Sequence, residues 1–161
     1  MNKAIVASLA SLTLALGLVA CAEEPAPVEA APEAPEGLTV TDARLNIPAA
    51  SGNPAALYFT LTNASGELLM LRAANVAGAE SASLHGTSEY AGQMTMPELI
   101  QIPVAAGETV EFEPGAKHVM VMGLPDGLEP GGEIEVTLSF LRGDKISFPA
   151  KLLAPGDDGG F

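Results

Sequence analysis

The sequence predicts an all-β domain, and three observations support this fold class. From Leu38 onward, apolar and polar residues alternate in short runs, as they do in strands that bury one face. Clusters of glycine, proline, asparagine and aspartate separate these runs. No segment of the domain repeats its apolar residues with the period of a helix. These features favour a Greek-key β-sandwich of about 115 residues, a size that buries an adequate core by itself.

Nine strands are expected in chain order, most of them bounded by turn residues. They are Leu38–Asn46, Ala56–Thr62, Leu68–Ala74, Ser81–His85, Ile100–Val104, Thr109–Phe112, His118–Met122, Glu133–Phe140 and Lys145–Leu152. The turn signals between them are 51–54, 63–66, 114–115, 125–127, 130–132 and 143–144. Asn63-Ala64-Ser65 matches a glycosylation acceptor, but Leu18-Val19-Ala20-Cys21 resembles a bacterial lipobox, so the segment is predicted to be a turn.

The strand Glu133–Phe140 has the clearest pattern. Ile134 and every second residue after it are apolar, while Glu133 and every second residue after it are polar. Successive side chains of a strand point to opposite faces, so the apolar set is predicted to face the core. Met70, which lies in an apolar run, is predicted to pack in the same core.

The chain divides into four predicted parts. Residues 1–20 read as a lipoprotein signal peptide, 21–36 as a lipidated cysteine with a Pro/Ala/Glu-rich tether, 37–154 as the β-domain and 155–161 as a short tail. The apolar run in 4–20 is short for a membrane span and follows Lys3, which is typical of a secretory signal. Residues 22–36 contain too few large apolar side chains to form a core and are expected to be extended.

The single cysteine, Cys21, follows the apolar run directly. Leu18-Val19-Ala20-Cys21 resembles the bacterial lipobox, which implies cleavage before Cys21 and lipid attachment to it. The alternative is a free thiol near an ordinary cleavage site. The lipobox predicts a periplasmic protein anchored to a membrane, with the choice between inner and outer membrane left open.

Composition excludes several classes of function. The formal net charge of −13 argues against a nucleic-acid partner, because nucleic-acid binding needs a basic face. With Cys21 used for lipid, the β-domain has no disulfide and no thiolate for a metal. A blue-copper site is therefore disfavoured, since it needs a cysteine beside two histidines. No catalytic signature is present, so an enzyme is not expected.

Histidine and methionine cluster in two segments of the domain. The chain has two histidines, His85 and His118. The first segment is His118-Val119-Met120-Val121-Met122. Alternation places His118, Met120 and Met122 on one strand face. Met122 starts about 13 Å from His118, too far to share one ion, and is assigned to packing or a supporting position. The second segment holds Met94 and Met96.

This donor chemistry favours Cu(I). Thioether sulfur is soft and neutral, whereas zinc, calcium and magnesium prefer harder or charged ligands. Neutral imidazole also suits copper. A site built from these groups adds no charge and holds a monovalent ion less tightly than thiolates do.

The domain resembles the periplasmic copper chaperone family PCuAC over roughly 38–152. The family motif is a histidine, ten residues, a methionine, twenty-one residues and His-x-Met, and His85, Met96 and His118-Val119-Met120 match it without a gap. The resemblance implies a cupredoxin-like Greek-key fold and one Cu(I) held by His85, Met96, His118 and Met120. Some members carry a further His/Met-rich tail, but 154–161 contain neither residue, so no second site is expected.

The family role implied is delivery of copper to the binuclear copper centre of cytochrome oxidase, or to related cuproproteins. The expected partner is therefore a copper acceptor with cysteine ligands. Two alternatives remain: a periplasmic copper-buffering lipoprotein, and a metal-free lipoprotein that binds another protein. The roles of Met94 and Met122 stay open.

Overall fold

The computed structural model of the chain describes residues 34–90 and 92–157, which contain eleven strands and no helix. The signal peptide, Cys21 and most of the predicted tether lie outside the described residues. No helix in the described part is long and apolar enough to cross a membrane. The strands are β1 (Leu38–Asn46), β2 (Ala55–Asn63), β3 (Leu69–Val76), β4 (Ser81–His85), β5 (Ser88–Tyr90), β6 (Gln93–Thr95), β7 (Ile102–Val104), β8 (Thr109–Phe112), β9 (His118–Met122), β10 (Glu133–Phe140) and β11 (Lys145–Leu153).

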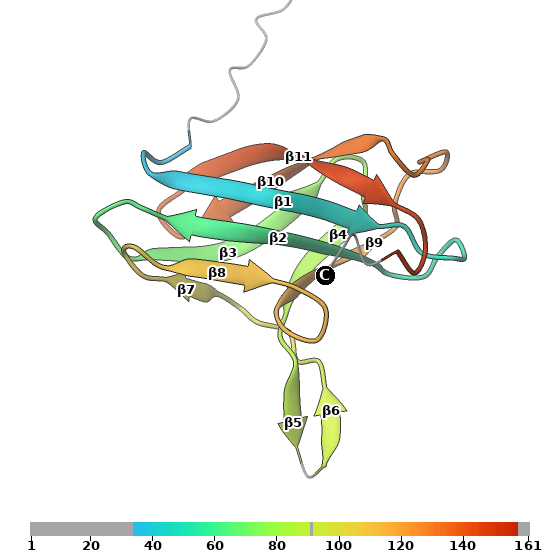
Figure 1. The fold of residues 1–161 in the computed structure, drawn as a ribbon, viewed down its shortest axis with the longest axis horizontal. Helices are drawn as coiled ribbons and strands as arrows, with labels where there is room; N and C mark the ends of the chain where they lie inside the picture. The colour runs from blue at the N-terminus through green and yellow to red at the C-terminus, as the bar shows by residue number, and fades with distance from the viewer. Residues whose placement is uncertain (1–33, 91, 158–161) are drawn as a thin grey trace, which may run out of the picture.

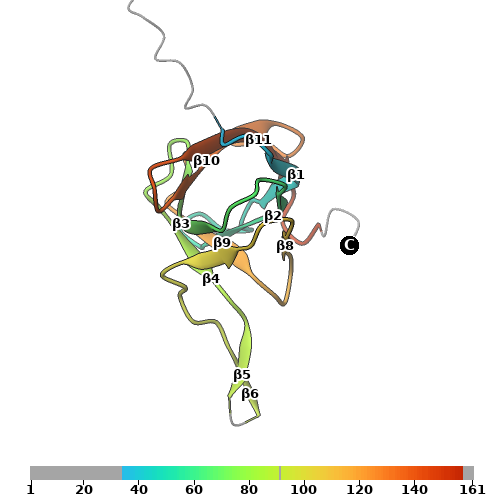
Figure 2. The same ribbon diagram turned by 90° about the vertical axis from the view of Figure 1, so that its left-hand side faces the viewer.

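Nine of the strands form one curled sheet, and β5 with β6 forms a hairpin that projects from it (Figure 1). The order across the sheet is β4-β9-β2-β1-β11-β10-β3-β7, and β8 pairs with β2 beside β9. β1 and β11 run parallel, whereas the other paired strands are antiparallel. Figure 2 shows the sheet wrapping around the interior, so the two layers of the predicted sandwich belong to one continuous sheet.

Apolar residues from both layers fill the interior. β2 alternates fully buried and half-buried residues along its length, which places Leu57, Phe59 and Leu61 inside. Phe59 stacks on Phe112 of β8 with ring centroids 4.1 Å apart, a contact worth about 0.5–1.5 kcal/mol beyond its burial. β10 shows the predicted alternation, with its apolar residues buried from Ile134 to Phe140.

The predicted all-β class is confirmed, and all nine expected strands are present. The bounds of β1, β4, β8, β9 and β10 coincide with the prediction, and the other four differ at their ends by one or two residues. The β5–β6 hairpin was not predicted. Its described side chains are exposed and polar or flexible, so no buried face imposes an alternating pattern on the sequence.

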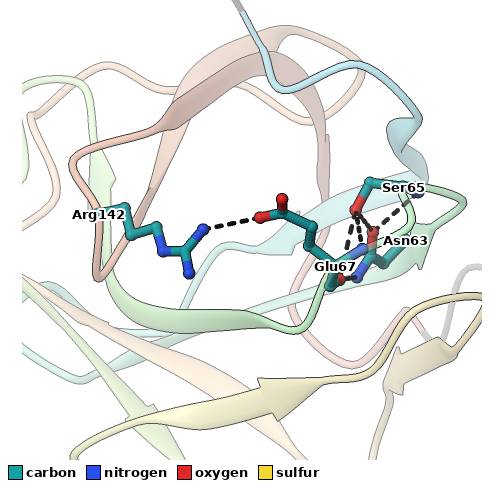
Figure 3. A network of polar contacts seen from close by, with 4 residues as sticks. All are labelled: Asn63, Ser65, Glu67 and Arg142. Atoms are coloured by element: carbon teal, nitrogen blue, oxygen red, sulfur yellow. Dashed lines mark hydrogen bonds and ion pairs between the residues drawn. The ribbon is translucent and has the colours of Figure 1, made fainter.

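Asn63 forms the turn that the sequence predicted. Its side chain is fully buried and donates hydrogen bonds to the carbonyl oxygens of Glu67, Val104 and Ala105, at 2.8–3.1 Å. Its Oδ1 accepts from the backbone N–H and the hydroxyl of Ser65 (Figure 3). Figure 3 also shows the exposed ion pair of Glu67 with Arg142, at 2.7 Å. Asn63 thus ties the β2–β3 turn to the end of β7.

Candidate metal centre

The two histidines meet at the edge of the sheet. β4 and β9 pair antiparallel, and their register sets His85 directly opposite His118. The imidazole rings are nearly parallel, with centroids 5.8 Å apart and an interplanar angle of 21°. Residues 33 positions apart in sequence are therefore brought together by backbone pairing alone. The register also sets Ser83 opposite Met120, on the same strand faces as the histidines.

His118 is held with one ring nitrogen available. The side chain is only 8% exposed, and its Nδ1 lies 3.1 Å from the carbonyl oxygen of Ala116. A carbonyl oxygen only accepts, so Nδ1 carries the proton and Nε2 keeps a lone pair. Fixing one nitrogen to a backbone carbonyl is the usual way in which proteins orient a metal-binding histidine.

His85 is held differently. Its Nδ1 lies 3.3 Å from the carbonyl oxygen of Met96, and its Nε2 lies 2.9 Å from the hydroxyl of Ser83. By the same logic Nδ1 donates, so Nε2 accepts the proton of Ser83. The lone pair that a metal would use is therefore engaged in a hydrogen bond. His85 is half-buried beside His118, and the open pocket in front of His118 is lined by other residues.

That pocket gathers three thioethers beside one imidazole. It has a volume of about 370 Å³, and its donor side chains are Met94, Met96, His118 and Met120. Backbone and side chains of Pro54, Ala55, Ala56, Tyr58, Thr87, Pro114 and Gly115 complete the walls. Burial raises the pKa of Tyr58, an effect that the charge of Arg44 opposes, so Tyr58 contributes a neutral phenol.

The base of the β5–β6 hairpin fixes the position of Met96. The N–H of Gly86 donates to Pro97 at 3.1 Å, and the N–H of Leu99 donates to Leu84 at 2.7 Å. These bonds add the segment after β6 to the free edge of β4. Met96, one residue past β6, is consequently placed where the hairpin leaves the body of the domain.

The donor set fits a soft monovalent ion. Among the described residues that line the pocket, none carries a carboxylate or a thiol. No three His, Cys, Asp or Glu side chains come together to hold a metal anywhere in the described part of the chain. Thioethers and imidazoles are the donors that favour Cu(I), whereas a carboxylate cluster would favour hard cations.

The structure thus brings together Met96, His118 and Met120 in one pocket and sets His85 at its side. It adds Met94, which the sequence singled out without assigning a role. The alternation Met94-Thr95-Met96 was the signal that could have found it. Met122 lies at the far end of β9 and lines a separate hollow with Glu80. Cys21 lies outside the described residues.

Sequence comparisons identify related proteins. The family model described as "Putative lipoprotein LpqE-like" matches residues 38–152. "Putative lipoprotein Lxx21020" from Leifsonia xyli subsp. xyli is 36% identical over 142 residues, covering 84% of this chain and 83% of its own length.

Solved structures share the fold. The copper-bound PCuAC domain from PmoF2 superposes with a TM-score of 0.62 at 20% identity, covering 78% of this chain and 99% of that one. The solution structure of CuI-DR1885 from Deinococcus radiodurans gives a TM-score of 0.56 at 26% identity, covering 84% and 89%. Apo-DR1885 from the same organism gives 0.59 at 24%, covering 94% and 98%. The domain therefore has the cupredoxin-like fold of PCuAC domains.

Proposed function

The chain belongs to the LpqE-like family and folds as PCuAC domains do, and from this premise we propose that it is a lipid-anchored Cu(I) metallochaperone of the periplasm. The observation that carries the proposal is the convergence of Met96, His118 and Met120 on one pocket. These residues come from two segments that are distant in the sequence and are joined only by the fold. Two of the structures that share this fold are named as copper-bound forms.

The proposed site binds one Cu(I) through His85, Met96, His118 and Met120. His118 presents Nε2 already oriented by Ala116, and the thioethers of Met96 and Met120 lie in the same pocket. His85 joins the site when its Nε2 exchanges the hydroxyl of Ser83 for the metal. Each of these ligands is neutral, so the bound ion keeps its single positive charge.

The absence of thiolate from this ligand set suits a donor of copper. Cysteine thiolate is a stronger soft ligand than thioether, so a dithiol acceptor draws Cu(I) away from the pocket. Met94 and Met96 are 67% and 60% exposed, which leaves the site open to an approaching protein. The proposed acceptor is an oxidase-assembly protein or oxidase subunit with cysteine ligands, and the chain itself catalyses no reaction.

The proposal is tested by Cu(I) titration of the full chain, purified in detergent under anaerobic, reducing conditions. We expect one Cu(I) per chain, with X-ray absorption showing both sulfur and nitrogen ligands. Met96→Leu and Met120→Leu should each weaken Cu(I) binding at least tenfold. Mutation of residues that only support metal ligands already lowers metal affinity by about tenfold or more. The fold should persist because the swap conserves volume. Met70→Leu, at a half-buried position of β3 outside the pocket, is the matched control.

Unchanged affinity in both pocket variants would contradict the ligand assignment. Failure of the wild-type chain to bind Cu(I) would favour the metal-free, protein-binding lipoprotein. Transfer is tested by mixing the loaded chain with a copper-free dithiol acceptor and following the metal by mass spectrometry. Binding without transfer, together with normal oxidase activity in a deletion strain under copper limitation, would favour copper buffering.

A further inference from the structure

The pocket contains one thioether more than the four-residue motif uses. We propose that Met94 is a further Cu(I) ligand, which takes the incoming ion together with Met96, Met120 and His118. This inference rests on the proposed function and extends it to a residue outside the motif. It also gives an order to the events, since His85 completes the site only after the ion has entered.

The hairpin directs Met94 toward the pocket. Met94 and Met96 are two residues apart, so they project from the same face of the extended segment. Thr95 projects from the other face, where its hydroxyl pairs with that of Ser88 at 2.9 Å and lies 3.1 Å from the Ser88 carbonyl oxygen. Consistent with this alternation, both methionines line the pocket with Met120, and Thr95 does not.

Packing does not account for Met94. Its side chain is 67% exposed, although methionine in folded domains usually fills gaps in a core. The hairpin that carries it stands away from the sheet in both views (Figures 1 and 2). A long, flexible thioether in this position can reach an ion that enters from solvent, because its several rotatable bonds leave its sulfur free to adjust.

The state of His85 leaves a coordination position for Met94 to fill. The Nε2 of His85 is engaged by Ser83, whereas Met94, Met96, Met120 and His118 already line the pocket. Three sulfurs and one nitrogen supply four soft or borderline donors and leave the hydrogen bonds of His85 and His118 intact. His85 takes this position only when its bond to Ser83 opens, so Met94 holds the ion in the larger part of the bound population.

The test uses the full chain labelled with carbon-13 in its methionine methyl groups and titrated with Cu(I) alone. The methyl signals of Met94, Met96 and Met120 should shift during the titration, whereas those of Met70 and Met122 should not. Met94→Leu should lower Cu(I) affinity about tenfold. Met122→Leu is the matched control, because Met122 is also exposed but lines a different hollow.

The outcomes separate this inference from the proposed function. If the wild-type chain binds Cu(I) but the Met94 methyl signal does not move, and Met94→Leu binds within twofold of wild type, Met94 is no ligand and the proposed function stands. If the wild-type chain binds no Cu(I), both fail. A shifted Met94 signal with tenfold weaker binding by Met94→Leu supports the inference.

Discussion

At the scale of single residues, a hydrogen bond would compete with the proposed metal binding by His85. The hydroxyl of Ser83 occupies Nε2 of His85 at 2.9 Å, and that nitrogen is the one with a lone pair. A hydrogen bond of this kind contributes about 0.5–1.5 kcal/mol net. Ser83→Ala removes the competitor, so Cu(I) affinity should rise about two- to tenfold. Competition with a chromophoric Cu(I) chelator measures the change.

Ser81→Ala is the control for this variant, because exposed Ser81 lies at the opposite end of β4 from His85. A loss of affinity in Ser83→Ala would show instead that the hydroxyl orients His85 for binding.

A second residue, Asn63, affects stability rather than the site. Its buried side-chain amide donates a hydrogen bond of 2.9 Å to the carbonyl oxygen of Val104, and this bond is shielded from solvent. Asn63→Ala leaves that oxygen without this partner, which should lower the free energy of unfolding by about 1–3 kcal/mol. Urea denaturation measures the loss, and Asn75→Ala, at an exposed position of β3, should stay within about 0.5 kcal/mol of wild type. Equal effects of the two substitutions would contradict this role of Asn63.

At the scale of the elements, the hairpin is the least supported part of the described fold. The side chains of β6 are all exposed, and only the bonds at the hairpin base join it to β4. Amides of β5 and β6 should therefore exchange with solvent deuterium faster than those of β2. Cu(I) should slow this exchange, because an ion bound by Met96, His118 and Met120 would tie the hairpin to β9. Mass spectrometry of peptides covering 86–98 measures the effect.

Peptides from β10 provide the internal reference, since this strand is far from the pocket in the sheet order. If the chain binds Cu(I) but deuterium exchange in the hairpin is unchanged, the hairpin takes no part in the site.

Elements with a buried face were the ones that the sequence could predict. β10 buries every second residue from Ile134 to Phe140, and this alternation predicts the bounds of the strand. The pairing of β4 with β9 could not be derived from alternation, because register depends on which strands become neighbours. The resemblance to PCuAC supplied His85 and His118 as a pair, whereas the contact of His85 with Ser83 on the same strand depends on side-chain orientations that alternation does not specify. Met94 stayed unassigned because its alternation with Met96 does not by itself show that the hairpin brings it to the pocket.

At the scale of the whole molecule, the proposed lipid anchor would hold the proposed copper site at a membrane. Cys21→Ala should abolish labelling by a radioactive or clickable fatty acid and release the chain from membranes. Cu(I) affinity should remain, because the pocket residues all lie between Pro54 and Met120 and none lies near Cys21 in the sequence. Labelling and membrane fractionation measure the first effect, and chelator competition measures the second. A variant that is still labelled and membrane-bound would contradict the lipobox interpretation.

The parallel pairing of β1 with β11 has a consequence for how the chain folds. The first strand lies in the middle of the sheet, between β2 and the last strand to be synthesised. Until Lys145–Leu153 is available, β1 lacks one neighbour, and β10 lacks the strand that connects it to β1. Closure of such distant pairings is slow, typically milliseconds to seconds for sheet-rich domains. A chain that ends before Lys145 therefore leaves one edge of β1 and one edge of β10 unpaired, and such edges are where a sheet can pair with another chain.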